Sequence, residues 1–85
     1  MNINILYFAR LAETLGCKQE SLEIPSDCKT VSDLVSTLRS RGEPFDTAFD
    51  GTTRVLVAIN QEMSDPGETI QNGDEVAFFP PVTGG

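Results

Sequence analysis

Histidine and tryptophan are both absent from this sequence, and the only cysteines are Cys17 and Cys28. Without histidine, and without a Cys-x-x-Cys spacing, the chain cannot assemble a zinc site of the usual cysteine–histidine type. No nucleophile–base pair is apparent, and no glycine-rich loop of the kind that cradles phosphate. The sequence therefore predicts a protein that is not an enzyme by itself and that binds no permanent cofactor and no metal.

The two cysteines leave two further questions open. A single disulfide between them is compatible with the sequence, but a cytosolic chain is expected to keep both thiols reduced. A cysteine that handles sulfur is the sharper alternative. It is disfavoured because neither residue has a neighbouring base or basic cluster in the sequence to lower the pKa of its thiol.

Basic residues are also scarce, and the formal net charge is −7. Nucleic-acid binding requires a basic footprint that displaces counterions, and no cluster provides one, so a nucleic-acid partner is excluded. The acidic balance either keeps the protein soluble or steers it toward basic protein surfaces. The six basic residues are Arg10, Lys18, Lys29, Arg39, Arg41 and Arg54.

Long apolar runs are missing as well. The sequence opens without a charged-then-apolar leader, and its apolar runs are too short to span a bilayer, which predicts a cytoplasmic protein with no membrane association. The 85 residues, 39% of them hydrophobic, suffice for one domain with a single modest core.

What is present is a clear pattern of strands and one helix. Residues 3–9, 20–25, 54–60 and 74–79 read as strands, the first two forming a hairpin. Between them, Val31, Leu34, Val35 and Leu38 follow the i, i+3, i+4, i+7 spacing of one helical face. Thr30 and Asp33 have the positions of a capping box, and Gly42 is a natural stop.

A second, short helix is expected over residues 44–49, where Phe45, Ala48 and Phe49 share one side. A hairpin followed by an amphipathic helix and further strands predicts a two-layer α+β domain. This is the order of the ubiquitin-like β-grasp fold, with a mixed sheet of four to five strands whose first and last strands lie parallel at the centre. The expected domain covers residues 1–79, and residues 80–85 are expected to form a flexible C-terminal tail.

That tail has a chemistry of its own. Gly84 and Gly85 have no side chains, so an extended end can thread a narrow channel and present the Gly85 carboxylate to a nucleotide. Pro80 and Pro81 stiffen the approach and lower the entropy lost on docking. Activation as an acyl-adenylate would allow conversion to a thiocarboxylate. On the diglycine alone, a frayed and inert terminus remains the alternative.

The segments "YFARLAETLG", "VSDLVSTLRSRG", "VAINQE" and, above all, "GDEVAFFPPVTGG" resemble the small sulfur-carrier subunit of molybdopterin synthase, in the same order. The resemblance covers essentially the whole chain and is strongest over residues 73–85. It implies that Gly85 carries the adenylate and then the thiocarboxylate, while Gly84 keeps the tail thin. The sulfur would then pass to a pterin precursor in the partner.

The resemblance also implies a set of partners. The first is the large catalytic subunit of molybdopterin synthase, in a heterotetramer of two small and two large subunits. The second is an adenylating enzyme that is related to ubiquitin activators and uses ATP. The third is a sulfur-donor system. Docking residues follow partly from the strand pattern, which places Phe8 and Phe79 in an exposed aromatic patch, and partly from the resemblance. The expected partner-binding residues are Phe8, Met63, Phe79, Pro80, Pro81, Val82 and Thr83.

Three other readings stay open at this stage. A sulfur carrier for thiazole or thionucleoside synthesis shares the diglycine, as does a ubiquitin-like modifier that is conjugated to lysines. A β-grasp interaction module with an inert tail belongs to a different class. The product formed at the tail, a thiocarboxylate or an isopeptide, distinguishes the carrier from the modifier.

Overall fold

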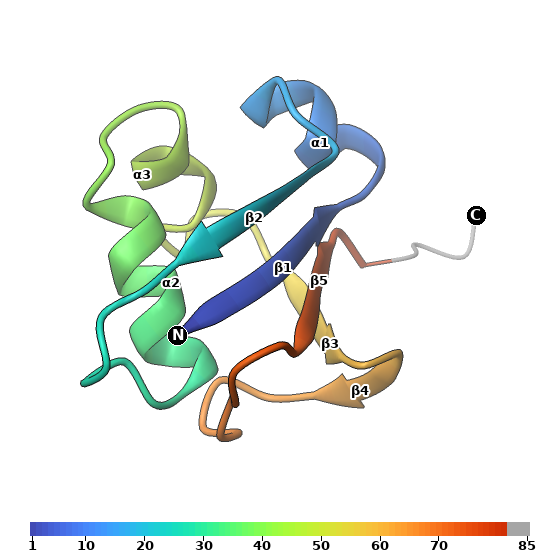
Figure 1. Cartoon of the computed structure of the whole chain (residues 1–85). Helices are drawn as coiled ribbons and strands as arrows, with labels where there is room; N and C mark the ends of the chain where they lie inside the picture. The colour runs from blue at the N-terminus through green and yellow to red at the C-terminus, as the bar shows by residue number, and fades with distance from the viewer. Residues whose placement is uncertain (82–85) are drawn as a thin grey trace.

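The computed structural model describes residues 1–81, which form one sheet and a set of helices on one side of it (Figure 1). No helix in this range is long and apolar enough to cross a membrane. The elements in chain order are β1 (Asn2–Tyr7), α1 (Ala9–Leu15), β2 (Gln19–Glu23), α2 (Val31–Arg39), α3 (Phe45–Ala48), β3 (Leu56–Ile59), β4 (Glu62–Ser64) and β5 (Glu75–Phe79).

The sheet has the strand order β2-β1-β5-β3-β4. β1 and β5, the first and last strands, pair in parallel, and Tyr7 lies opposite Phe78. All other neighbouring strands are antiparallel. The mixed sheet with a parallel central pair, together with the helix that follows the first hairpin, confirms the predicted β-grasp arrangement.

Helix α2 forms where the sequence pattern places it. The Thr30 hydroxyl accepts a hydrogen bond from the backbone N–H of Asp33, and the Asp33 carboxylate accepts one from Thr30 in return, so the predicted capping box is present. Val31, Leu34 and Leu38 are buried in the core, whereas Val35 is only partly buried at its margin. The helical face was thus predicted correctly, with Val35 at its edge.

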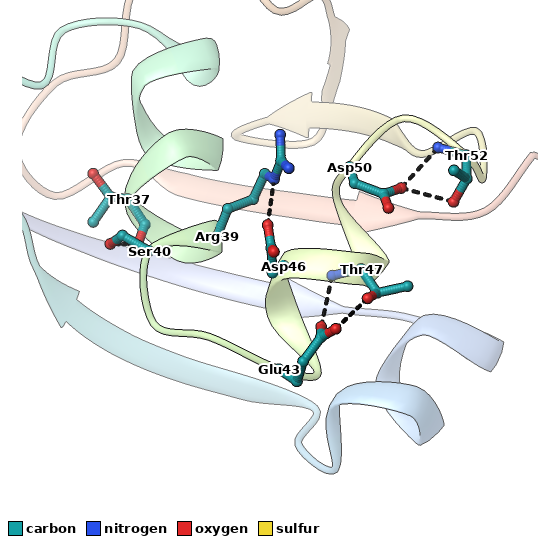
Figure 2. Close-up of polar contacts among 8 residues, drawn as sticks. All are labelled: Thr37, Arg39, Ser40, Glu43, Asp46, Thr47, Asp50 and Thr52. Atoms are coloured by element: carbon teal, nitrogen blue, oxygen red, sulfur yellow. Dashed lines mark hydrogen bonds and ion pairs between the residues drawn. The ribbon is translucent and has the colours of Figure 1, made fainter.

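Helix α3 fixes an aromatic cluster against the central strands. The rings of Phe49 and Phe78 meet edge to face with centroids 5.0 Å apart, and Tyr7 stacks on Phe78 at 6.3 Å. Outside the core, Arg39 on α2 forms an ion pair of 2.8 Å with Asp46 on α3 (Figure 2). The two helices therefore hold the inner face of β5 in place.

The strands are shorter than the sequence pattern indicates. β1 stops at Tyr7 and β2 at Glu23, and β3 begins only at Leu56. β4, which was not predicted as a separate element, forms because Asn60 and Gln61 adopt φ values of 49° and 71°. These values make a two-residue hairpin loop between Ile59 and Glu62.

A polar network ties the edge strand β2 to the core. The Glu20 carboxylate accepts hydrogen bonds from the Tyr7 hydroxyl at 2.8 Å and from Arg41 at 2.9 Å. The guanidinium of Arg41 lies over the ring of Phe45, 4.4 Å from its centroid. Burial opposes ionisation of Glu20, but the hydrogen bonds from Arg41 and Tyr7 outweigh it and lower the pKa of this carboxyl group.

This shift predicts a pH-dependent contribution to stability. A carboxyl group whose pKa is lowered by folding stabilises the fold above its unfolded pKa, roughly 4.3 for glutamate, and loses this effect as the pH falls through the folded pKa. We therefore expect Glu20→Gln to lower the free energy of unfolding by about 1 kcal/mol or more at pH 7 and by less at acid pH. Urea titrations at several pH values measure this difference.

The matched control is Glu23→Gln, which changes an exposed residue of the same strand. Its effect on the free energy of unfolding is expected to be small, because the side chain is exposed. An equal loss for Glu20→Gln at neutral and acid pH would contradict the assignment of the network.

Candidate functional site: the tail root and the outer face of the sheet

The segment that leads to the predicted tail leaves from the centre of the sheet. β5 is hydrogen-bonded to β1 on one side and to β3 on the other, up to the pairing of Phe79 with Leu56. Pro80 then ends the strand, because proline has no N–H for the ladder. Pro80 and Pro81 are both partly buried. We call these two prolines the tail root.

The remaining predicted tail residues, Val82, Thr83, Gly84 and Gly85, lie outside the described residues. Their predicted roles stay predictions. What the structure does provide is the position of the residues from which they continue. The tail root follows a strand that is paired on both sides, so its position relative to the rest of the domain is fixed by the sheet.

One face of the sheet carries apolar side chains that do not belong to the core. Alternation along the strands turns Ile5, Tyr7 and Phe78 inward and the residues between them outward. The strand registers place Leu6, Ala77, Ala58 and Met63 side by side in one row, and Phe79 and Leu56 in the next. We call this surface the outer apolar face; it consists of Leu6, Phe8, Leu56, Ala58, Met63, Ala77 and Phe79. Within it Ala58 and Ala77 are buried between their larger neighbours, and Phe8 and Met63 are the exposed large side chains.

Phe8 is the most prominent aromatic residue of this face. Its backbone N–H donates to the Phe78 carbonyl at 3.1 Å, which extends the β1–β5 pairing beyond the end of β1. The next residue, Ala9, has φ = 54°, which is uncommon outside glycine, and the chain turns there into α1. The Phe8 side chain remains 48% exposed, as predicted.

Phe79 differs from the prediction. It was expected to be exposed with Phe8, but it is only partly exposed. Phe79 is the last residue of β5, which has a neighbouring strand on each side, and Leu56 on β3 lies directly opposite it, so neighbouring residues cover part of its ring. The aromatic patch is therefore dominated by Phe8, with Phe79 as its partly covered neighbour.

Met63 lies at the lateral margin of the outer apolar face, on the edge strand β4. It is 66% exposed and pairs with Ala58, which in turn pairs with Ala77. Met63 was predicted to bind the partner; the structure shows it exposed on this face, and its part in an interface stays a prediction. Leu56 was missed, and the signal that reveals it is its pairing with Phe79.

The end of this face that is remote from the tail root is polar, and polar groups there form hydrogen bonds with one another. The Asn60 side chain donates to the Asp74 carboxylate at 3.0 Å and accepts from the Glu75 backbone N–H at 3.0 Å. Asn4 lies beside Glu75 and is exposed. Apolar surface is thus concentrated toward the tail root.

The cysteines take no part in this surface. Cys28 is buried and Cys17 partly buried, and neither forms a disulfide. Burial raises the pKa of both thiols, and Asp33 near Cys28 and Glu20 near Cys17 raise it further. A raised pKa depletes the thiolate, so neither residue is prepared to act as a nucleophile.

The described residues offer no group of side chains that could hold a metal ion. What they provide is a fixed stem, the tail root, beside an outer apolar face that includes two exposed large side chains, Phe8 and Met63. Contiguous apolar surface of this kind is typical of protein–protein interfaces. The arrangement suits a domain that docks on a partner and offers it a chain end.

Comparisons with known proteins identify a family and several relatives of this chain. The family model of the ThiS family matches residues 5–85. The chain is 36% identical to the molybdopterin synthase sulfur carrier subunit of Haemophilus influenzae, over 98% of this chain and 99% of that protein.

A second relative carries a different name. The chain is 34% identical to small archaeal modifier protein 1 of Haloferax volcanii, over 92% of this chain and 94% of that protein. The crystal structure of SAMP1 from Haloferax volcanii superposes with a TM-score of 0.77, at 29% identity and with full coverage of both chains.

Proposed function

The chain belongs to the ThiS family, and on this premise we propose that it is a sulfur carrier in the synthesis of molybdopterin. One observation carries the proposal: over nearly its whole length the chain is similar to a molybdopterin synthase sulfur carrier subunit, and it has Gly84-Gly85 after the tail root. In this role it is the small, non-catalytic subunit of a sulfur-transferring complex. The catalytic side chains belong to its partner.

The proposed chemistry takes place at the Gly85 carboxylate. A carboxylate oxygen attacks the α-phosphorus of ATP in an adenylating enzyme, and pyrophosphate leaves. Sulfide-level sulfur from the donor system then attacks the acyl carbon, the bond between this carbon and the AMP oxygen breaks, and AMP leaves, so that a thiocarboxylate remains. In the large subunit this sulfur passes to a pterin precursor. Gly84 and Gly85 serve this sequence because neither places a β-carbon against the wall of a channel.

The described residues support the docking part of the proposal. A tail that must enter a partner needs a rigid stem, and the tail root follows a strand held on both sides. The outer apolar face next to it supplies the surface that would pack on the large subunit. We propose that two small and two large subunits assemble in this way, with Val82 and Thr83 lining the path into the large subunit's active site.

Intact-mass analysis tests the sulfur-carrier function. The chain is co-expressed with an adenylating enzyme and a sulfur source. We expect its mass to rise by the difference between one sulfur and one oxygen atom, and we expect the purified product to convert a pterin precursor in the presence of the large subunit. A chain that keeps its mass under these conditions, and that binds no large subunit, would argue against the proposal.

A second function is favoured by the similarity to small archaeal modifier protein 1. The same activated Gly85 could form an isopeptide bond with a lysine amine instead of accepting sulfur. Conjugates of higher mass, with the diglycine remnant on lysine side chains after proteolysis, would identify the modifier. The thiocarboxylate without such conjugates identifies the carrier.

The outer apolar face gives a mutational prediction. We expect Phe8→Ala to weaken binding to the large subunit by about tenfold or more, because exposed aromatic side chains near the centre of an interface dominate its affinity. The melting temperature is expected to change little, since Phe8 is 48% exposed in the free chain. Calorimetric titration and thermal unfolding measure the two effects.

The matched control for this variant is Asn4→Ala. Asn4 lies on the same strand and the same face, but at its polar end. Its replacement is expected to leave binding unchanged. A Phe8→Ala variant that loses stability and retains full affinity would place Phe8 in the fold and not in the interface.

A further inference from the structure

Two arginines lie on either side of the point where the chain leaves the sheet after β5. β1 runs parallel to β5, so the C-terminal end of β1 lies at the same end of the sheet as the tail root. β3 runs antiparallel to β5, so the N-terminal end of β3 lies at that end of the sheet too. Arg10 follows β1 in the first turn of α1, and Arg54 precedes β3. The tail root therefore has Arg10 on the side of β1 and Arg54 on the side of β3.

The two arginines also border common space. Two adjacent hollows of about 500 and 560 Å³ lie at the tail root, and Arg10, Arg54 and Pro80 line both of them. The first hollow has Leu11 and Val55 in its wall, while the second reaches Pro81. Two side chains from distant parts of the sequence thus line the same two hollows beside the tail root.

Neither arginine is neutralised by an ion pair within residues 1–81, where the ion pairs are Arg39–Asp46 and Arg41–Glu20. Two glutamates lie nearby, one at each hollow. Glu43 borders the first, but its carboxylate accepts hydrogen bonds from the backbone N–H and the hydroxyl of Thr47 (Figure 2). Glu13 borders the second and forms no ion pair in the described range.

We propose that Arg10 and Arg54 form a carboxylate-binding site for the large subunit, and that this subunit has acidic side chains at the mouth of the channel that receives the tail. The inference rests on the proposed function, because it assumes that the tail enters a partner. It adds the kind of surface that the partner presents and the residues of this chain that recognise it.

Charge and chemistry favour carboxylates as the ligand. A guanidinium presents a planar set of donors that matches a carboxylate in a two-point contact. The chain as a whole has a net charge of −7, so it repels an acidic partner surface overall. Such a surface is attracted only to places on this chain where basic side chains lie together. Arginines on both sides of the tail root would steer such a surface to this point.

Position also connects this site with the outer apolar face. Phe8 precedes Arg10 by two residues, and Leu56 follows Arg54 by two. The apolar face and the arginines therefore meet at the tail root. A partner that covers Phe8 and accepts the tail would place its channel mouth against both guanidinium groups.

The experiment compares two double variants that lose the same amount of positive charge. Arg10→Gln/Arg54→Gln removes it at the tail root, and Lys18→Gln/Lys29→Gln removes it elsewhere on exposed residues. Association of each with the large subunit is followed by stopped-flow fluorescence at low and high salt, and thermal unfolding confirms that each variant is folded. We expect the arginine variant to associate about tenfold more slowly at low salt, a difference that shrinks as salt is added.

The lysine variant is expected to associate at about the wild-type rate. Equal slowing of both variants would overturn the proposal, since only overall charge would then matter, and so would an unchanged rate for the arginine variant. Faster association of the arginine variant would mean that the arginines hold the chain's own carboxylate, which also overturns it. Failure of the wild-type chain to bind the large subunit would instead overturn the proposed function, and this inference with it.

Discussion

One alanine added after Gly85 is expected to abolish thiocarboxylate formation. Adenylation acts on the α-carboxylate, and an added residue moves the reactive carbon past its position in the partner's channel. Reactions that depend on proximity lose about a hundredfold in rate for a misplacement of about 1 Å, and one residue spans about three times that length. An alanine also places a β-carbon at the new end. Intact-mass analysis after co-expression with the adenylating enzyme measures the product.

The same extension is expected to leave the domain folded. The core lies between the sheet and the helices, and within residues 1–81 Phe78 is the last buried residue. Circular dichroism should therefore be native, and binding to the large subunit should persist through the outer apolar face. A matched control adds the alanine before Met1, at the other end of the chain, where thiocarboxylate formation should continue. A carboxyl-extended chain that still acquires sulfur and supports pterin conversion would refute the carrier function.

Replacement of Leu34 or Leu38 by alanine is expected to cost about 2–5 kcal/mol of unfolding free energy. Both side chains are completely buried, with 0% exposure, on the face of α2 that packs in the core. Their removal leaves a cavity that the surrounding side chains fill only in part. For a domain of this size such a loss is a large share of the total stability. Urea denaturation monitored by circular dichroism measures it.

Val35→Ala is the matched control for these variants. Val35 lies on the same helix, one residue after Leu34, but at the margin of the core and only partly buried. Its replacement should cost clearly less than that of Leu34. If the three variants were equally stable, the buried face of α2 would be assigned incorrectly.

The helix could be predicted well from the sequence because its signals are local. The spacing of Val31, Leu34 and Leu38 reports the buried face directly, and the capping box formed by Thr30 and Asp33 marks where the helix begins. Both features depend on residues within two turns of one another. The capped start and the buried positions of α2 therefore agree with the sequence pattern.

The strands and the docking surface were predicted less completely because they depend on distant partners. The partial burial of Phe79 follows from its position opposite Leu56, and the separate strand β4 follows from the turn at Asn60 and Gln61. Likewise, the approach of Arg10 and Arg54 to the tail root is invisible in a sequence that separates them by more than half its length. It appears only when the order β1-β5-β3 is known.

The central position of β5 has a consequence for biosynthesis. Among the described strands β1 is synthesised first, whereas its parallel neighbour β5 is synthesised last. Contacts of such long sequence separation form late and slowly. A chain whose synthesis stops before Glu75 leaves β1 and β3 with unpaired edges, which invite aggregation and proteolysis. The sheet is therefore completed only by the strand that directly precedes the tail root, and a chain truncated before this strand lacks the pairing at the centre of its sheet.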